Sequence, residues 1–395
     1  MARSLQGPVR GLIGGAVAVA VVVGAVAFFG TAEPDRDAPA AGTWEPLPDA
    51  GIAGRSQPSV VWTRTAMVVW GGEGDAGPLG DGAAYDLADD RWAPLPPAPL
   101  GPRQGHTAVW TGNKMLVFGG EGPREGCEGL CPLADGAAYD PDSATWSPMA
   151  TPPIGARHGH SAVFVKGRMV VWGGAGEGGA ALGDGASYDP ATDTWAALPA
   201  PTMAPRVGHR AVATTDSMLV WGGSSEEAEG GRYFADGAIY SPATDQWRTM
   251  APAPASLAGR DNAAGVWTGT ALVVWGGFGR SEECTPCFYG DGAAYDPVAD
   301  TWAPIAPSPL GGRGAHRAVW TSRDMLVWGG SDAEVRAGGA LYNPVDDTWI
   351  GIVAGPLAAR PHHAMVWTGS PLVIWGGAGA GGALDDGAVL TMFAH

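Results

Sequence analysis

Cysteines and histidines are the residues of this chain best suited to chemistry, and the sequence arranges both in patterns. The four cysteines form two close pairs, Cys127 with Cys131 and Cys284 with Cys287. In an exported protein such pairs predict local disulfides that stiffen loops. The same spacing also permits a zinc site with four cysteine ligands, or thiol–disulfide exchange. We favour two disulfides, since a thioredoxin-like redox motif requires a βαβ context that the pattern here does not offer.

Most histidines recur at one place, the end of an Arg-x-x-His phrase: His106, His160, His209, His316 and His363. A histidine that recurs with a repeat is typical of a structural position rather than of a metal ligand. His158 and His362 depart from the phrase, but nothing beside them has metal-ligand spacing. We therefore expect no metal and no other cofactor, and we assign no catalytic residue.

The arginine of the same phrase recurs seven times, as Arg55, Arg103, Arg157, Arg206, Arg260, Arg313 and Arg360. An aspartate follows in six of the seven repeats, as Asp81, Asp135, Asp184, Asp236, Asp291 and Asp386, and Gly338 stands in the sixth. Guanidinium forks pair well with carboxylates, which favours a structural role for this set. The alternative is a polar rim that recognises an anionic or polar ligand. Arg313 and Arg360 flank the repeat without aspartate, so we expect these two to be free for a ligand.

These residues are positioned by a long internal repeat. Seven strand-like segments end in Gly-Gly, at Gly72, Gly120, Gly174, Gly223, Gly277, Gly330 and Gly377. The period is about 50 residues, and each unit is predicted to form four short strands. In the second unit these are Arg103 to Trp110, the strand ending at Gly120, Asp135 to Pro141, and Thr145 to Pro148.

The Gly-Gly, Tyr-Asp-Pro and Thr-Trp phrases resemble the kelch repeat family across residues 43–390. The resemblance implies an all-β fold, a kelch-type β-propeller whose four-stranded blades surround a central channel. The count of Gly-Gly strands predicts seven blades. The last blade lacks a fourth strand of its own, and Thr43–Leu47 carries the missing Thr-Trp-x-Pro phrase. We predict that this N-terminal outer strand completes the last blade and closes the ring, which removes exposed sheet edges.

The N-terminal segment is predicted to be a targeting signal outside the fold. Arg3 and Arg10 precede an uncharged run from Gly11 to Ala32, long enough for either a cleaved signal peptide or a membrane anchor. We expect residues 1–32 to be a signal peptide or signal anchor, 33–42 a linker and 43–395 the propeller. Both alternatives place the propeller outside the cytoplasm, membrane-anchored or secreted.

Composition limits the class of partner. The formal net charge of −17 argues against nucleic acid binding, because the basic footprint is absent. The 64 glycines and 34 prolines are spaced with the repeat, so we interpret them as turn residues. The 18 tryptophans all fall on periodic strand positions, which favours core packing over ligand stacking.

Long connections between second and third strands depart from the repeat, and loops of this kind often carry function. The cysteine pairs lie in two of them, in blades two and five, which a seven-fold ring places nearly opposite. A shared zinc would need both loops to fold over the channel.

The loops of blades four and five supply a candidate ligand-binding patch, to which Arg313 and Arg360 are added: Arg232, Tyr233, Phe234, Phe278, Arg280, Phe288 and Tyr289. Exposed aromatic residues with arginine favour binding, although these rings could instead pack the loops onto the body.

We expect a monomeric, membrane-tethered binding module that recognises a protein or glycan ligand through its loops. The alternative is an enzyme of the cell envelope that acts on sugars at the channel mouth, as kelch-like mutarotases do, on fold analogy alone. Galactose oxidase is also kelch-like, but its copper centre needs a cysteine near a unique tyrosine. Here six of the eight tyrosines belong to the repeat, and no cysteine stands alone beside a unique tyrosine. Enzymatic activity is therefore left open.

Overall fold

The computed structural model describes residues 42–225, 231–352 and 354–392. The predicted targeting segment and nearly all of the predicted linker lie outside these residues. No helix within the described ranges is long and apolar enough to cross a membrane. The described chain is built of short β-strands and one 3-10 turn, η1 (Glu177–Gly179).

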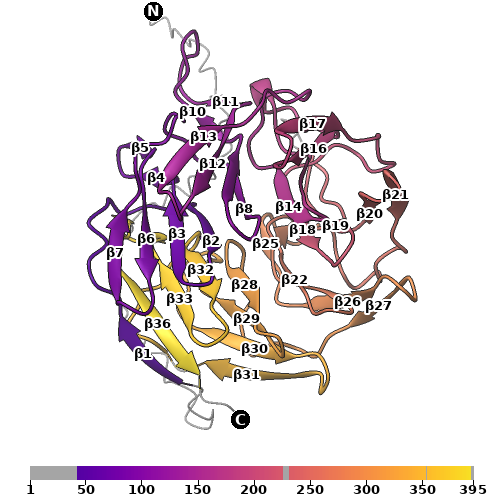
Figure 1. Cartoon of the computed structure of the whole chain (residues 1–395). Coiled ribbons are helices and arrows are strands. Elements are labelled where there is room, and N and C mark those ends of the chain that lie inside the picture. The colour runs from indigo at the N-terminus through magenta and orange to yellow at the C-terminus, as the bar shows by residue number, and fades with distance from the viewer. Residues whose placement is uncertain (1–41, 226–230, 353, 393–395) are drawn as a thin grey trace, which may run out of the picture.

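Seven four-stranded antiparallel sheets are arranged radially around one axis (Figure 1). The first strand of each blade lies nearest the axis, and these strands contact one another in a closed cycle. They are β2 (Ser59–Trp62), β8 (Thr107–Trp110), β14 (Ser161–Val165), β18 (Arg210–Ala213), β22 (Ala264–Trp267), β28 (Arg317–Trp320) and β32 (Ala364–Trp367). The structure is therefore the predicted seven-bladed β-propeller.

The second strands form the core of the blades. They are β3 (Ala66–Trp70), β9 (Met115–Phe118), β15 (Arg168–Trp172), β19 (Met218–Trp221), β23 (Leu272–Trp275), β29 (Met325–Trp328) and β33 (Leu372–Trp375). Nearly every residue in them is buried, because each blade is sandwiched between two others. This explains why the segments are continuous apolar runs rather than alternating ones.

The third and fourth strands complete each sheet outward. The third strands are β6 (Gly82–Asp86), β12 (Gly136–Asp140), β16 (Gly185–Asp189), β20 (Gly237–Ser241), β26 (Gly292–Asp296), β30 (Gly339–Asn343) and β36 (Gly387–Met392). The fourth strands are β7 (Arg91–Pro94), β13 (Thr145–Pro148), β17 (Thr194–Ala197), β21 (Gln246–Thr249), β27 (Thr301–Pro304), β31 (Thr348–Ile352) and β1 (Gly42–Pro46).

Blade seven combines the two ends of the described chain. Strand β1 pairs antiparallel with β36, with Trp44 opposite Leu390 and Glu45 opposite Val389. In Figure 1 the N-terminal β1 lies beside the C-terminal β36 at the outside of one sheet. The Thr-Trp phrase that precedes the first blade therefore forms the fourth strand of blade seven, while β7 is the fourth strand of the first blade.

The Arg-x-x-His phrase was expected inside the first strand, and this is wrong. Strand β8 begins at Thr107, one residue after the phrase. The four residues before it turn across the end of the blade, where Gln104 forms an isolated bridge with Glu121. The Arg-x-x-His phrase instead forms part of the contact between neighbouring blades.

The Gly-Gly pair is required by the close approach of the next blade. Gly71 has a φ of 63°, and a Cβ there would lie 2.6 Å from His106 Cε1 of blade two. The N–H of Gly72 donates to the carbonyl of Arg103, also in blade two, at 2.9 Å. The same bond recurs at all seven blade boundaries, ending with Gly377 to Arg55. The Gly-Gly pair thus recurs in every blade because each blade packs against its two neighbours in the same way.

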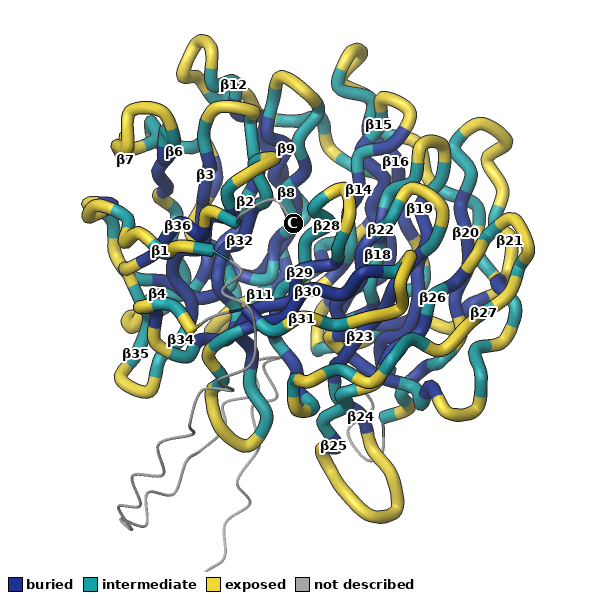
Figure 2. The backbone as a smooth tube through the Cα atoms, turned by 90° about the horizontal axis from the view of Figure 1, so that it is seen from below, coloured by how far each residue is buried: buried dark blue, intermediate teal, exposed yellow. Residues whose placement is uncertain are grey.

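The propeller has two different faces (Figure 2). We call the loop face the one with the connections from second to third strands, and the turn face the one with the tight turns. Four short hairpins stand on the loop face: β4 (Glu73–Gly74) with β5 (Gly77–Pro78), β10 (Glu121–Gly122) with β11 (Cys131–Pro132), β24 (Phe278–Gly279) with β25 (Cys287–Phe288), and β34 (Ala378–Gly379) with β35 (Gly382–Ala383).

Candidate functional site

The seven repeated arginines lie beneath the loop face, and six of them form the same ion pair. In blade two, Arg103 Nη1 and Nη2 donate to the two carboxylate oxygens of Asp135 at 2.8 and 2.9 Å. Arg103 Nη1 also donates to the carbonyl of Gly119 at 3.0 Å. The equivalent ion pairs are Arg55–Asp81, Arg157–Asp184, Arg206–Asp236, Arg260–Asp291 and Arg360–Asp386. These arginines tie the start of the third strand to the end of the second, so their role is structural.

Arg360 was expected to be free for a ligand, and this is wrong. Its Nη1 lies 2.8 Å from Asp386 Oδ1, and the arginine is fully buried. The expectation failed because the aspartate partner comes from the same blade, not from the neighbouring one. Only the blade that lacks aspartate can leave its arginine without a carboxylate.

Arg313 of blade six is that exception. It is 5 % exposed and donates to the carbonyls of Gly311 and Gly329, both at 3.1 Å. Within the described ranges no carboxylate lies at ion-pair distance from it, because Gly338 occupies the aspartate position. Burial, and then the charge of Arg336, lower the pKa of Arg313 to about 10, while Asp332 opposes the shift. Arg313 therefore remains a cation at neutral pH, with no carboxylate partner among the described residues.

A second position changes together with the aspartate in blade six. Two residues before the aspartate, the other blades carry Leu79, Leu133, Leu182, Phe234, Tyr289 and Leu384, and blade six carries Arg336. Arg336 is held by Asp332, with Nη2 2.7 Å from Oδ2. Blade six thus presents Arg336 and Gly338 where each other blade presents an apolar side chain and an aspartate, so it has two arginines in place of one.

The aromatic residues of the blade-four and blade-five loops divide into two groups. Phe234 and Tyr289 occupy the repeated apolar position and stack on Arg206 and Arg260, each guanidinium carbon 4.2 Å from the ring centroid. Their interpretation as residues outside the repeat is therefore wrong, and they pack the loops onto the body. Phe234 and Tyr289 do lie at the spacing of the repeat. Four other blades carry leucine at this position, so the sequence analysis did not recognise the two aromatic residues as members of the same set.

The remaining three rings form what we call the aromatic strip: Tyr233, Phe278 and Phe288. The ring centroids of Tyr233 and Phe278 are 6.2 Å apart, as are those of Phe278 and Phe288. All three are half-buried. Phe278 lies against Gly314, where a Cβ would come within 2.9 Å of its Cδ1. The strip therefore spans blades four and five and ends against Gly314 of blade six, the residue that follows Arg313.

Two exposed arginines border the aromatic strip. Arg232 extends over the ring of Phe234, with its guanidinium carbon 5.4 Å from the centroid. Arg280 is exposed at the end of β24. The structure thus gathers five of the eight predicted ligand-binding residues on one side of the loop face, and it assigns Phe234, Tyr289 and Arg360 to packing.

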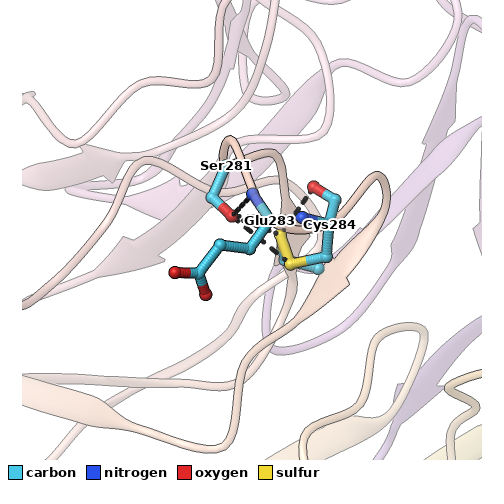
Figure 3. The surroundings of a disulfide bond; sticks show 4 residues. Ser281, Glu283 and Cys284 are labelled. Atoms are coloured by element: carbon cyan, nitrogen blue, oxygen red, sulfur yellow. Dashed lines mark hydrogen bonds between the residues drawn. A yellow bond between two sulfur atoms is a disulfide. The ribbon is translucent and has the colours of Figure 1, made fainter.

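Each cysteine pair is joined as a disulfide within its own loop, Cys127 with Cys131 and Cys284 with Cys287. Figure 3 shows the second bridge, where the Ser281 hydroxyl accepts from the N–H groups of Glu283 and Cys284 at 3.1 and 3.3 Å. Among the described residues no cysteine is free, and no group of His, Cys, Asp or Glu is placed to hold a metal ion. The bridges stiffen the two long loops, and the second holds the loop that carries Phe288.

Polar side chains gather at the loop-face mouth of the channel. Gln104 Nε2 donates to Glu121 Oε1 at 2.9 Å, and His158 Nε2 lies 3.8 Å from Glu121 Oε2. Burial and the charge of Glu121 raise the pKa of Glu73. Three blades therefore contribute carboxylates and an imidazole to one region. The sequence analysis overlooked this cluster, because its members each follow a repeated residue and are spread over three blades.

The turn face contains a cavity that the sequence analysis also missed. It has a volume of about 370 Å³ and is lined by Trp62, Trp267, Trp320, Trp367 and apolar residues of the first strands. These four indoles are half-buried, whereas the second-strand tryptophans are fully buried. The first-strand indoles still pack against the core clusters of their blades, and four of them also line this cavity. The sequence feature that could have indicated this cavity is the absence of tryptophan from the first strands of blades three and four, which carry Phe164 and Ala213.

A second cavity of about 700 Å³ opens between blades four and five on the same face. Its lining includes Trp247, Arg248 and Asp296, and it shares Trp267 with the first cavity. The small side chain of Ala213 stands at the position of the first-strand tryptophans beside this boundary. The turn face is therefore hollowed on one side of the ring.

Comparison with known families agrees with this geometry. The KLHDC2/KLHL20/DRC7 Kelch-repeats domain family matches residues 105–330, which is more than half of the 395-residue chain. Comparison with curated protein sequences found no significant match. The seven blades, the Gly-Gly second strands and this match agree: the chain belongs to the kelch-repeat β-propeller family.

Proposed function

We propose that this propeller is an interaction module that captures a protein segment on its loop face, along the aromatic strip and at Arg313. The observation that carries the proposal is the buried Arg313 guanidinium, which has no carboxylate partner in the described chain, while the aromatic strip packs against the next residue, Gly314. In six other blades the same guanidinium position holds a carboxylate. A partner carboxylate would therefore complete a geometry that the fold already builds, while apolar partner side chains cover the rings.

A protein segment suits this surface better than a glycan. The rings of the aromatic strip meet one another at steep angles, 73° for Tyr233 with Phe278 and 55° for Phe278 with Phe288. Such a surface is uneven rather than one flat platform. A glycan ligand remains the second arm of the test.

The test uses the full-length protein to capture partners from envelope extract and to probe a glycan array. A captured partner is then titrated against Arg313→Gln and against Tyr233→Ala with Phe288→Ala. We expect each to weaken binding at least about ten-fold. The matched control is Arg248→Gln, an exposed arginine of the turn face. Equal affinity for all variants would overturn the loop-face proposal.

We infer that the propeller is exported and tethered by its N-terminal segment. Support comes from Arg3 and Arg10 before the uncharged run to Ala32 and from two disulfides, which persist in oxidising compartments. Membrane fractionation of the full chain and of a chain beginning at Glu33 tests this. Membrane association of the full chain alone is expected, and mass spectrometry of the mature N-terminus distinguishes an anchor from a cleaved signal. Recovery of both chains in the cytoplasm would contradict it.

One observation favours a second candidate, a sugar-active enzyme of mutarotase type. Glu73, Glu121 and His158 supply acid–base groups at the loop-face mouth of the channel. Exchange between anomers, followed by NMR over a panel of sugars, tests for this activity. Activity that Glu121→Gln reduces about 100-fold would support the enzyme, and no acceleration by the wild-type protein would exclude it for those sugars.

A further inference from the structure

Two arginines stand in the central channel at a position where other blades carry small side chains. Arg210 begins β18 and Arg317 begins β28. The equivalent residues of the other blades are Ser59, Thr107, Ser161, Ala264 and Ala364. Thr107 and Ser161 bond the histidine of the next blade, His160 and His209, at 2.8 Å. The two arginines therefore replace a structural contact and make none with an imidazole.

Both arginines lie across the inner strand of the next blade. Arg210 Nε donates to the carbonyl of Gly265 in blade five at 3.2 Å. A Cβ at Gly265 would lie 2.7 Å from Arg210 Cγ, so only glycine leaves room for the side chain. The other blades have Val, Ala or Met at this position. Arg317 Nε donates to the carbonyl of His363 in blade seven at 3.1 Å.

The two guanidinium groups repel each other and have no carboxylate partner among the described residues. Burial and then the charge of Arg317 lower the pKa of Arg210 to about 10, and burial lowers the pKa of Arg317. Guanidinium groups stay protonated in proteins at neutral pH, so both arginines carry a positive charge. Placing two like charges in a confined site without a counter-ion costs free energy. An anion that enters the channel would offset this cost.

The lining of the turn-face cavity includes residues that follow Gly265 and Arg317 in the chain. Arg210 bonds Gly265, and the next residue, Val266, lines the cavity. Arg317 precedes Ala318, which also lines it. Both arginines are half-buried, so part of each side chain still meets solvent. The cavity, of about 370 Å³, is therefore lined by apolar groups, and its lining starts one residue along the strands from Gly265 and Arg317.

Its outer wall is aromatic. Trp62, Trp267, Trp320 and Trp367 line the opening. Indole faces suit flat apolar bodies, and indole N–H groups suit polar atoms at their edge. A volume of this order accommodates a small organic molecule.

We propose that the channel binds a small organic carboxylate through its turn face, with the carboxylate held between Arg210 and Arg317 and its flat apolar body against the four tryptophans. This site is separate from the loop face and does not depend on the function proposed there. The chain as a whole carries a net charge of −17, so two unpaired cations at one place mark a local preference for anions.

The experiment is calorimetric titration of the full-length protein with three probes: phenylacetate, its neutral counterpart phenylacetamide, and acetate. Phenylacetate is expected to bind at one site. Phenylacetamide should bind at least about ten-fold more weakly, because it lacks the charge. Acetate should also bind at least about ten-fold more weakly, because it lacks the ring. No binding of phenylacetate, or equal binding of all three probes, would overturn the proposal.

Variants locate the site. Arg210→Met with Arg317→Met keeps side-chain volume and removes both charges, and it should abolish phenylacetate binding. Trp320→Leu should weaken phenylacetate at least about ten-fold and leave acetate unchanged. Arg232→Met on the loop face is the matched control and should leave binding unchanged. Full binding by the double variant, or equal loss in the control, would overturn the proposal.

Thermal unfolding with and without phenylacetate shows both whether a variant is folded and whether it binds the probe. Phenylacetate should raise the Tm of the wild-type protein and not that of the double variant. Gly265→Ala retains both charges but displaces the stem of Arg210, so it should weaken binding while the protein stays folded. Unchanged affinity in a folded Gly265→Ala protein would contradict the role given to Arg210.

Discussion

The indole rings of Trp44 and Trp328 pack with their centroids 6.2 Å apart, which joins the first described strand to blade six. The same contact recurs at every other blade boundary, where a fourth-strand tryptophan packs on the second-strand aromatic of the preceding blade. Trp44 therefore takes the place of a fourth-strand tryptophan that the C-terminal repeat does not encode. Closure of the ring depends on this contact and on the pairing of β1 with β36.

Trp44→Ala should lower the free energy of unfolding by about 3 kcal/mol, because it removes a large core side chain at the seam. Glu45→Ala, an exposed residue of the same strand, should change it by less than about 0.5 kcal/mol. Urea unfolding of both variants measures the difference. Deletion of residues 43–48 should open the ring and lower the Tm, and an unchanged Tm would contradict closure by this strand.

Ala264→Ser should stabilise the propeller by about 1 kcal/mol. In blade three the Ser161 hydroxyl bonds His209 of the next blade at 2.8 Å. In blade five Ala264 holds the same position, and neither ring nitrogen of His316 has a well-formed hydrogen bond within the described residues.

The control for that change is Ala364→Ser. The next blade carries Pro58 in place of histidine, so the new hydroxyl finds no imidazole and should give no gain. Chemical denaturation of both variants measures the difference. Equal effects of the two substitutions would contradict a contact with His316.

Arg360→Met should destabilise the protein by about 2 kcal/mol more than Arg313→Met. The first substitution removes the fork with Asp386, at 2.8 Å, and several carbonyl contacts. The second removes a buried cation with no carboxylate partner in the described chain, which methionine can replace at similar volume. Equal losses in a denaturation experiment would show that Arg313 has a counter-ion.

Stability should fall as the pH decreases from 6.5. Burial, and then a neighbouring arginine, lower the pKa of His106, His209 and His316 to about 3. In the unfolded chain these histidines titrate near 6.5. Between these values the unfolded chain binds protons that the folded chain does not, so stability is full above pH 6.5 and declines below it.

At pH 5 each such histidine should cost on the order of 2 kcal/mol. Denaturation at pH 7.5, 6 and 5 measures the slope, and this range lies above the usual titration of carboxylates. His209→Gln should flatten the profile in proportion to one proton. A profile that is flat for the wild-type protein would contradict neutral buried imidazoles.

Thiol titration of the denatured, unreduced protein isolated from its natural compartment should find no free thiol, and reduction should release four. This follows from the bridges Cys127–Cys131 and Cys284–Cys287. Cys284→Ser with Cys287→Ser should weaken the loop-face ligand more than Cys127→Ser with Cys131→Ser, because only the former loop carries Phe288. Four free thiols before reduction would show that the bridges do not form.

The repeat, the number of blades and the role of β1 could all be predicted from the amino-acid sequence. This was possible because every blade meets the same neighbours, so the residues between blades recur with the period of the chain. Gly71, His106 and Trp70 are each one instance of a set that the sequence repeats, and repetition makes such sets visible.

Only the tertiary structure decided which members of a repeated set differ in their surroundings. Arg313 and Arg360 were both predicted to be free for a ligand. In the structure Arg360 is paired with Asp386, whereas Arg313 has Gly338 where its aspartate partner would be. Trp70 and Trp320 are both periodic, but one is enclosed between blades and the other lines a cavity. Arg210 and Arg317 begin inner strands of two different blades, yet the charge of Arg317 lowers the pKa of Arg210, because the centre of a ring brings single residues of different blades into electrostatic range. Such relationships follow from the curvature of the assembled ring, which no single repeat encodes.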